Sequence, residues 1–150
     1  MTTYPDAYLA LKAQLSVDLM DIDNELMKMP QLVQDAAELA AEASDDENVS
    51  HLAYDVMKAE AGMRLREEAT DRITEAAIER QLPLDEGVQE ARMAYENAVT
   101  YAKLCTALVN ALRTKSSLLQ KASDLIIAGY ITPSAAYERR REAINSQRNR

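Results

Sequence analysis

The longest stretch of this chain without glycine or proline runs from Val88 to Ala128. Small and apolar residues recur along it at alternating steps of four and three, the seven-residue repeat of helices that pack lengthwise. The repeat comprises Ala91, Tyr95, Ala98, Ala102, Cys105, Val109, Leu112, Ser116, Leu119, Ser123 and Ile126. At about 1.5 Å per residue, a helix over 85–128 would be ~60 Å long. The pattern predicts that this helix forms the spine of the molecule.

The rest of the sequence also favours helices. Its 150 residues include only three glycines, four prolines and no Trp or Phe. Ala, Leu, Glu and Arg are abundant, and these side chains lose little rotamer freedom in a helix. A chain of this length is typical of one domain. We therefore expect an all-α fold, an elongated helical bundle or coiled coil, with a single helical domain over residues 1–150.

The width of the apolar face on the long helix indicates assembly. A second stripe, from Leu104 to Leu125, runs beside the first and makes the face wider than a two-stranded coiled coil requires. Small residues along the first stripe allow close approach and leave area for other chains to cover. We therefore predict a homo-oligomer. The predicted oligomerisation seam comprises Tyr95, Ala98, Ala102, Cys105, Val109, Leu112, Leu119 and Ile126.

N-terminal helices are expected over 1–43. Apolar residues at three- and four-residue steps predict a first helix over about 5–29. Pro30 is expected to interrupt it, because proline lacks a backbone donor and disfavours helical geometry in the preceding residue. A short helix over 31–43 then follows. The polar run at 44–48, Ser-Asp-Asp-Glu-Asn, predicts an exposed loop.

The next predicted helices, over 49–82, carry a basic element. A helix over 49–69 places several apolar residues on one face. Thr74 predicts the N-cap of a short helix that Pro83 closes, since threonine accepts from free amides and proline cannot continue a helix. A loop at 81–87 then leads into the long helix. The apolar face of the 49–69 helix comprises Leu52, Val56, Ala59 and Met63.

Charge is unevenly distributed within a net −8. Residues 1–100 hold 22 acidic and 8 basic side chains, whereas residues 101–150 hold 3 and 9. Gly129 predicts the end of the long helix, and a final basic helix is expected over 133–147, with Arg139, Arg140 and Arg141. Such asymmetry fits head-to-tail contact between subunits, an anionic partner such as nucleic acid at one end, or a solvated acidic surface with a basic tail.

Little in the sequence indicates catalysis. Cys105 is the only cysteine, at a heptad position where a small buried hydrophobe is expected, so no intrachain disulfide forms. His51 is the lone histidine, and the glycines stand apart, so no phosphate-binding loop is present. We expect no enzyme activity, metal or cofactor. No apolar run reaches ~20 residues and no signal peptide is evident, so the expected setting is the cytoplasm without membrane contact.

Basic residues are the remaining candidates for a binding site. They lie on and after the 49–69 helix, where they can neutralise the phosphates of nucleic acid with salt-dependent affinity. Acidic neighbours such as Glu60, Glu67 and Glu68 can instead pair with them at helical spacing, and both interpretations stay open. The candidate nucleic-acid-binding residues are Lys58, Arg64, Arg66 and Arg72.

Three segments between Lys58 and Gly129 carry a family resemblance. They are Arg64-Leu65-Arg66, then Thr74-Glu75-Ala76-Ala77-Ile78, then a long helix with Leu104-Cys105-Thr106-Ala107-Leu108 and Ala111-Leu112 followed by Arg113 and Lys115. In this order they resemble the phage recombination mediator proteins of the UvsY type, over about half the chain. The acidic, longer N-terminal half and the scarcity of aromatic residues for base stacking depart from the pattern.

The resemblance implies a function. It implies a ring-like homo-oligomer whose long helices pack together, in the host cytoplasm if the protein is phage-encoded. It also implies single-stranded DNA held by Arg64 and Arg66, with Lys58 a weaker candidate, and contacts to a recombinase and a single-strand-binding protein. The alternative is an acidic helical scaffold, adaptor or inhibitor that acts through protein contacts without nucleic acid. An enzyme is the least supported interpretation, because no pair of carboxylates is placed in a cleft by spacing.

Overall fold

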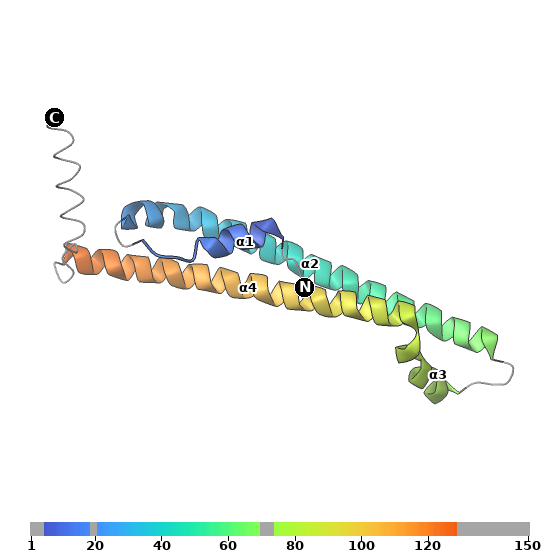
Figure 1. Ribbon diagram of the computed structural model, residues 1–150. Coiled ribbons are helices and arrows are strands. Elements are labelled where there is room, and N and C mark those ends of the chain that lie inside the picture. Colours follow the sequence, from blue (N-terminus) through green and yellow to red (C-terminus); the bar gives the residue numbers. More distant parts are fainter. Residues whose placement is uncertain (1–4, 19–20, 70–73, 129–150) are drawn as a thin grey trace. The chain divides into compact units, whose positions relative to one another are not determined.

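A computed structural model describes residues 5–18, 21–69 and 74–128. These residues form α-helices and one short 3-10 helix, with no strand among them, which confirms the all-α prediction (Figure 1). The long helix predicted over 85–128 is confirmed, since it extends unbroken from Glu86 to Ile127. The elements are α1 (Asp6–Ala13), α2 (Ile22–Glu68), α3 (Glu75–Gln81), η1 (Leu82–Leu84) and α4 (Glu86–Ile127).

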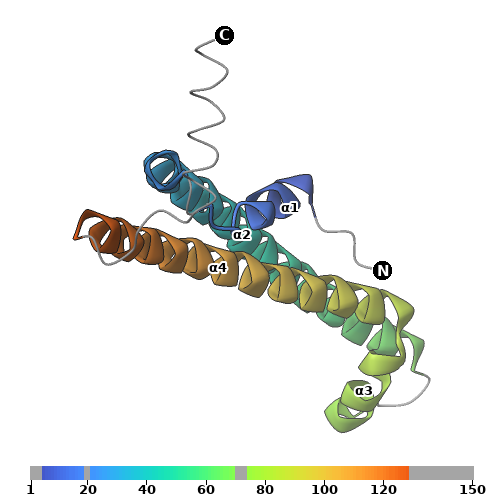
Figure 2. The same cartoon turned by 60° about the vertical axis from the view of Figure 1, so that its left-hand side comes forward.

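The helices contribute to two compact units. The terminal unit contains the chain up to Ala36 and the chain from Leu108 onward, and the middle unit is Ala37–Ala107. Within each unit, considered by itself, α2 and α4 lie side by side and run in opposite directions (Figures 1 and 2). The single domain expected from the sequence stays a prediction.

In the terminal unit, α1 is much shorter than the predicted helix over 5–29. It ends at Ala13, where the chain turns with hydrogen bonds from Gln14 N to Leu11 O and from Leu15 N to Lys12 O. The buried Lys115 ammonium from α4 accounts for this end. It donates to the carbonyl oxygens of Gln14 (2.6 Å) and Ser16 (2.7 Å), so a tertiary contact replaces continued helix.

The same ammonium forms an ion pair with Glu25 on α2. Lys115 is 4% exposed, and a buried cation is tolerated only when its donors are paired in this way. Apolar side chains around it complete the core and bury part of the predicted heptad face of α4 within the chain itself. The buried apolar residues of the terminal unit are Tyr8, Ile22, Met29, Ala36, Leu108, Val109, Leu112 and Leu119.

Helix α2 corrects two predictions in the N-terminal half. It passes through Pro30 without ending, although an interior proline removes one helical hydrogen bond and its ring crowds the carbonyl one turn earlier; Met29 and Ala36 nearby are buried. The polar run at 44–48 is helical, not a loop. Ser44, Asp45 and Asp46 are exposed as expected, but they form the solvated side of a helix whose neighbouring Ala43 is buried.

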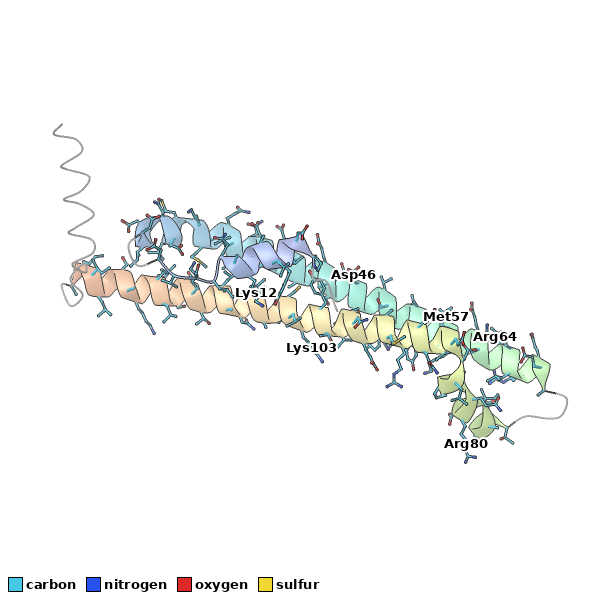
Figure 3. The ribbon with its side chains drawn as sticks, viewed as in Figure 1. Lys12, Asp46, Met57, Arg64, Arg80 and Lys103 are labelled. Atoms are coloured by element: carbon cyan, nitrogen blue, oxygen red, sulfur yellow. The ribbon has the colours of Figure 1, made fainter. Side chains whose placement is uncertain are left out.

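The middle unit has a close-packed interior of mostly small residues. The Thr74 hydroxyl accepts from Ala77 N at 3.3 Å, which confirms the predicted cap of α3. Gly87, at the start of α4, lies against Met57 of α2: a Cβ there would be 2.8 Å from Met57 Cε, so the end of that flexible side chain would have to shift. Met57 is labelled in Figure 3. The buried apolar residues are Ala43, Ala61, Ile78, Val88, Ala102 and Cys105.

The predicted oligomerisation seam is mostly covered within one chain. Ala102 and Cys105 are buried in the middle unit, and Val109, Leu112 and Leu119 are buried in the terminal unit. Tyr95 and Ala98 are half-buried, and Ile126 is 36% exposed. Contact with other chains through these residues stays a prediction. Packing within the chain already accounts for the apolar character of most of them.

Gly129 and the basic helix predicted over 133–147 lie outside the described residues. Within the described part of the chain, no helix combines the length and apolar character needed to span a bilayer.

Candidate nucleic-acid interface

Arg64 and Arg66 of the basic element lie on different sides of α2, because residues two apart on a helix are separated by about 200°. Arg64 Nη2 donates to Asp85 Oδ2 at 2.7 Å. Arg66 Nη2 donates to both carboxylate oxygens of Glu75, at 2.9 and 2.8 Å. The two arginines therefore tie α2 to the chain just before α4 and to the first turn of α3.

Asp85 has two roles in this arrangement. Its Oδ2 accepts from Arg64, and its Oδ1 accepts from the backbone amide of Val88 at 3.1 Å, which caps α4. The pairing expected at helical spacing, with Glu60, Glu67 or Glu68, is replaced by ion pairs with carboxylates more distant in the sequence. Arg72, the fourth candidate, lies outside the described residues.

The ion pairs leave the arginines accessible. The side chain of Arg64 is 53% exposed and that of Arg66 is 48% exposed. A guanidinium has five N–H donors, so each retains donors for a phosphate after binding its carboxylate. Arg64 is labelled on α2 in Figure 3, and Arg80, also labelled there, extends from α3.

A pocket of about 310 Å³ lies in the middle unit, lined by residues of α2, α3, η1 and α4. It brings together two cations, one tyrosine, one glutamate and an apolar floor contributed by η1 and α4. Gln89 Nε2 donates to the carbonyl of Pro83 at 2.8 Å, which holds η1 against the first turns of α4. The lining residues are Tyr54, Lys58, Glu79, Leu82, Pro83, Val88, Gln89 and Arg92.

Tyr54, the aromatic residue of the pocket lining, belongs to a cluster of three rings. The Tyr54 ring of α2 is stacked on the Tyr95 ring of α4, with centroids 6.3 Å apart and planes 7° from parallel. The His51 ring meets Tyr95 edge-on at 4.9 Å. Such aromatic pairs add attraction beyond the area they bury. The sequence indicated few aromatics for base stacking, and helix pairing concentrates three rings here.

Lys58 and Arg92 supply the positive charge of the pocket. Lys58 Nζ lies 5.2 Å from the centroid of the Tyr54 ring, and no carboxylate among the described residues pairs with it. Arg92 Nε donates to Glu96 Oε1 at 2.8 Å. That hydrogen bond and the charge of Glu96 raise the pKa of Arg92 further, so it is always cationic. Glu79 is the acidic residue of the lining and opposes anion binding.

The structure thus separates the predicted basic residues. Lys58 lines the pocket, while Arg64 and Arg66 bind carboxylates of the chain. Tyr54 and Arg92 were missed by sequence reasoning, because nothing in the linear pattern reveals that α2 and α4 pair at this register. The signal in the sequence is weak: Tyr54 and Lys58 are four residues apart on a helix, where side chains are neighbours.

Other candidates for chemistry are accounted for by the fold. Cys105 is buried, as predicted, and burial raises the pKa of its thiol, an effect that the neighbouring Tyr101 side chain partly offsets. A thiol in this environment is held in its unreactive, protonated form at neutral pH. Over the described ranges, no group of three or more His, Cys, Asp or Glu side chains is arranged to hold a metal ion.

Comparison of the chain with protein-family models, with curated proteins and with solved structures gives no match.

Proposed function

We propose that this protein is a phage-type recombination mediator: an elongated helical oligomer that binds single-stranded DNA and helps load a recombinase. One observation carries the proposal, the pocket whose lining includes Tyr54, Lys58 and Arg92. An aromatic face on which a base stacks, combined with cations that neutralise the adjoining phosphates, is the chemistry by which single strands are bound without sequence preference. The resemblance of the Arg64-to-Lys115 segments to mediator proteins supports the same function.

Assembly into an oligomer compensates for weak binding of single-stranded DNA by each pocket. One pocket with two cations in a chain of net charge −8 binds a single strand feebly. Several copies on one oligomer, a ring in the proposal, raise the effective concentration of sites along the same strand. The seam on α4 and the exposed apolar residues of that helix are the candidate contacts. A recombinase and a single-strand-binding protein are the proposed partners, in the host cytoplasm.

The ion pairs of Arg64 with Asp85 and of Arg66 with Glu75 favour the second candidate function, an acidic scaffold, adaptor or inhibitor. Both guanidinium groups already bind carboxylates of the chain, at 2.7 Å and 2.8 Å. If the arginines stay bound to these carboxylates and the pocket binds no single-stranded DNA, the protein acts through protein contacts alone. The two candidates differ in one measurable property, which is binding to an oligonucleotide at low salt.

The test is fluorescence anisotropy of a labelled oligothymidine over a salt series, with molecular mass measured in the same buffer. We expect affinity to fall as salt rises, and the Lys58→Ala/Arg92→Ala variant to bind at least about tenfold more weakly. Lys103→Ala is the matched control, because Lys103 is an exposed cation of α4 in the same unit that does not line the pocket (Figure 3).

We expect Lys103→Ala to change affinity by less than about twofold, as for removal of a remote surface charge. Absence of binding at low salt would favour the scaffold. A mass equal to one chain at micromolar concentration would contradict the oligomer.

A further inference from the structure

Within the middle unit, α2 carries an apolar stripe that is left exposed. Val49, Leu52, Val56 and Met63 are between 47% and 68% exposed, and the exposed Ala59 lies among them. Their spacing of three, four and seven residues places them on one face, which adds Val49 to the face predicted from the sequence. From Val49 to Met63 the stripe extends ~21 Å at 1.5 Å per residue. Four large apolar side chains on one contiguous helix face indicate an interaction surface.

The stripe is distinct from the face that packs inside the unit. Ala43 and Ala61 are buried, Tyr54 stacks on Tyr95 of α4, and Met57 lies against Gly87. At about 100° per residue these positions centre on one side of α2, and the stripe centres on the opposite side. Helix α2 is therefore apolar on two faces in this unit, and intrachain packing uses one of them.

Carboxylates border the stripe. Asp45 and Asp46 lie at its N-terminal end, and Glu60 and Glu67 lie along one edge (Figure 3 labels Asp46). All four are exposed, and none forms an ion pair with another described residue. Asp55 on the other edge lies 3.6 Å from His51. The surface is thus an apolar strip edged mainly by negative charge: His51 partly offsets Asp55, and Arg64 and Arg66, which border the C-terminal half of the stripe, are bound to Asp85 and Glu75.

We propose that this stripe docks an amphipathic helix of a partner protein whose apolar face is edged with Lys or Arg. A helix of about 15 residues matches the two heptads of the stripe, and its basic edges meet the unpaired carboxylates. A second copy of the same face is disfavoured, because it would place the same acids opposite one another. This proposal goes beyond DNA binding and does not depend on it, since the pocket residues lie on other positions of α2 and α4.

The test uses a labelled model peptide of about 18 residues with leucine at heptad positions and lysine on both edges, titrated with the full chain. We expect binding that the Leu52→Gln/Val56→Gln variant weakens by at least about tenfold, because the apolar contacts carry most of a helix-in-groove affinity. The control is Met93→Gln, which changes a 57% exposed apolar residue of α4 that lies outside the stripe. It is expected to bind within about twofold of the parent. Circular dichroism establishes that each variant keeps its helix content.

A second arm tests the charged edges. Glu60→Gln/Glu67→Gln is expected to weaken peptide binding about threefold at low salt, and the difference should vanish at high salt because these carboxylates are solvated. Glu90→Gln, an exposed acid of α4, is the matched control.

Three results would overturn the proposal. The first is equal binding of a scrambled peptide of the same composition, which would indicate attraction to net charge alone. The second is peptide affinity that is unchanged in Leu52→Gln/Val56→Gln. The third is a dimer that this variant converts to monomer, which would assign the stripe to a second copy. Oligothymidine binding of Leu52→Gln/Val56→Gln distinguishes failure here from failure of the DNA-binding proposal, because this uncharged substitution away from the pocket should leave it unchanged.

Discussion

Lys115 in the terminal unit and Arg64 and Arg66 in the middle unit are basic residues placed in opposite ways. Lys115 is 4% exposed, and its ammonium binds two backbone carbonyls and Glu25. Each arginine is about half exposed and binds a single carboxylate. The buried cation is fully used in holding the terminal unit together. The exposed cations stabilise their helices weakly and keep donors free for another anion.

The position of a charged side chain decides how much it contributes to stability. A buried ion pair that loses one partner leaves an uncompensated charge in a low-dielectric interior, whereas an exposed pair exchanges its partner for water at little cost. The resemblance to mediator proteins that we infer from the sequence rests on both the Arg64-Leu65-Arg66 element and Lys115. By the physical argument, Lys115 belongs to folding, and only the exposed residues remain candidates for DNA.

The largest expected change in stability is that of Lys115→Met, which keeps the volume of the side chain but removes its charge. We expect a loss of about 3 kcal/mol in the free energy of unfolding, because Glu25 and the carbonyls of Gln14 and Ser16 lose their donor. Urea denaturation followed by circular dichroism measures the loss.

Lys121→Met is the control, since Lys121 is an exposed residue of the same helix and unit. It is expected to stay within about 0.5 kcal/mol of the parent. A loss for Lys115→Met no greater than that of Lys121→Met would mean that the buried ion pair does not hold the terminal unit.

The Arg64→Ala/Arg66→Ala variant gives the converse result. Exposed pairs contribute about 0.2–1 kcal/mol each, so we expect a small change in unfolding free energy. Oligothymidine affinity should fall about tenfold at low salt, and the slope of log affinity against log salt should decrease by about 0.7 for each phosphate that the variant no longer neutralises. Assembly should be unchanged. Unaltered affinity together with a large loss of stability would assign both arginines to folding, as for Lys115.

Thr74→Ala is expected to have a small, local effect, confined to the stability of α3. The hydroxyl caps α3 by accepting from Ala77 N at 3.3 Å. Its removal should cost about 1 kcal/mol, because one free amide at the helix start loses its acceptor. Hydrogen exchange of the Ala77 amide should accelerate, while exchange at buried Leu112 in the terminal unit should not. Equal acceleration at both amides would show that the cap supports more than its own helix.

Local signals made some features of the fold predictable. The uninterrupted heptad from Val88 to Ala128 predicts α4 because it is long and its period is clear, and Thr74 predicts a cap through its own hydroxyl. The run at 44–48 misled, because polar side chains indicate exposure but do not distinguish a solvated helix face from a loop. The early end of α1 depends on Lys115, about a hundred residues away, which no local window contains.

The candidate site was less accessible to sequence reasoning. Lys58, Arg64 and Arg66 were identified from charge, but the carboxylates that bind the arginines, Asp85 and Glu75, lie across turns and helix contacts. The pocket needs the register between α2 and α4 that pairs Tyr54 with Tyr95. A heptad pattern predicts that helices pair and leaves the register open, so Arg92 could not be placed beside Lys58.

In the proposed function, a single strand of DNA binds the middle unit at Tyr54. Nuclear magnetic resonance of ring-labelled tyrosines during titration with oligothymidine tests it most directly, because Tyr8 in the terminal unit, 6% exposed, serves as a reference in the same molecule. The account predicts a large shift of the Tyr54 ring resonance, saturating with the binding curve, and an unchanged Tyr8. Binding that shifts Tyr8 and leaves Tyr54 unchanged, or an absence of any shift at saturating oligothymidine, would contradict it.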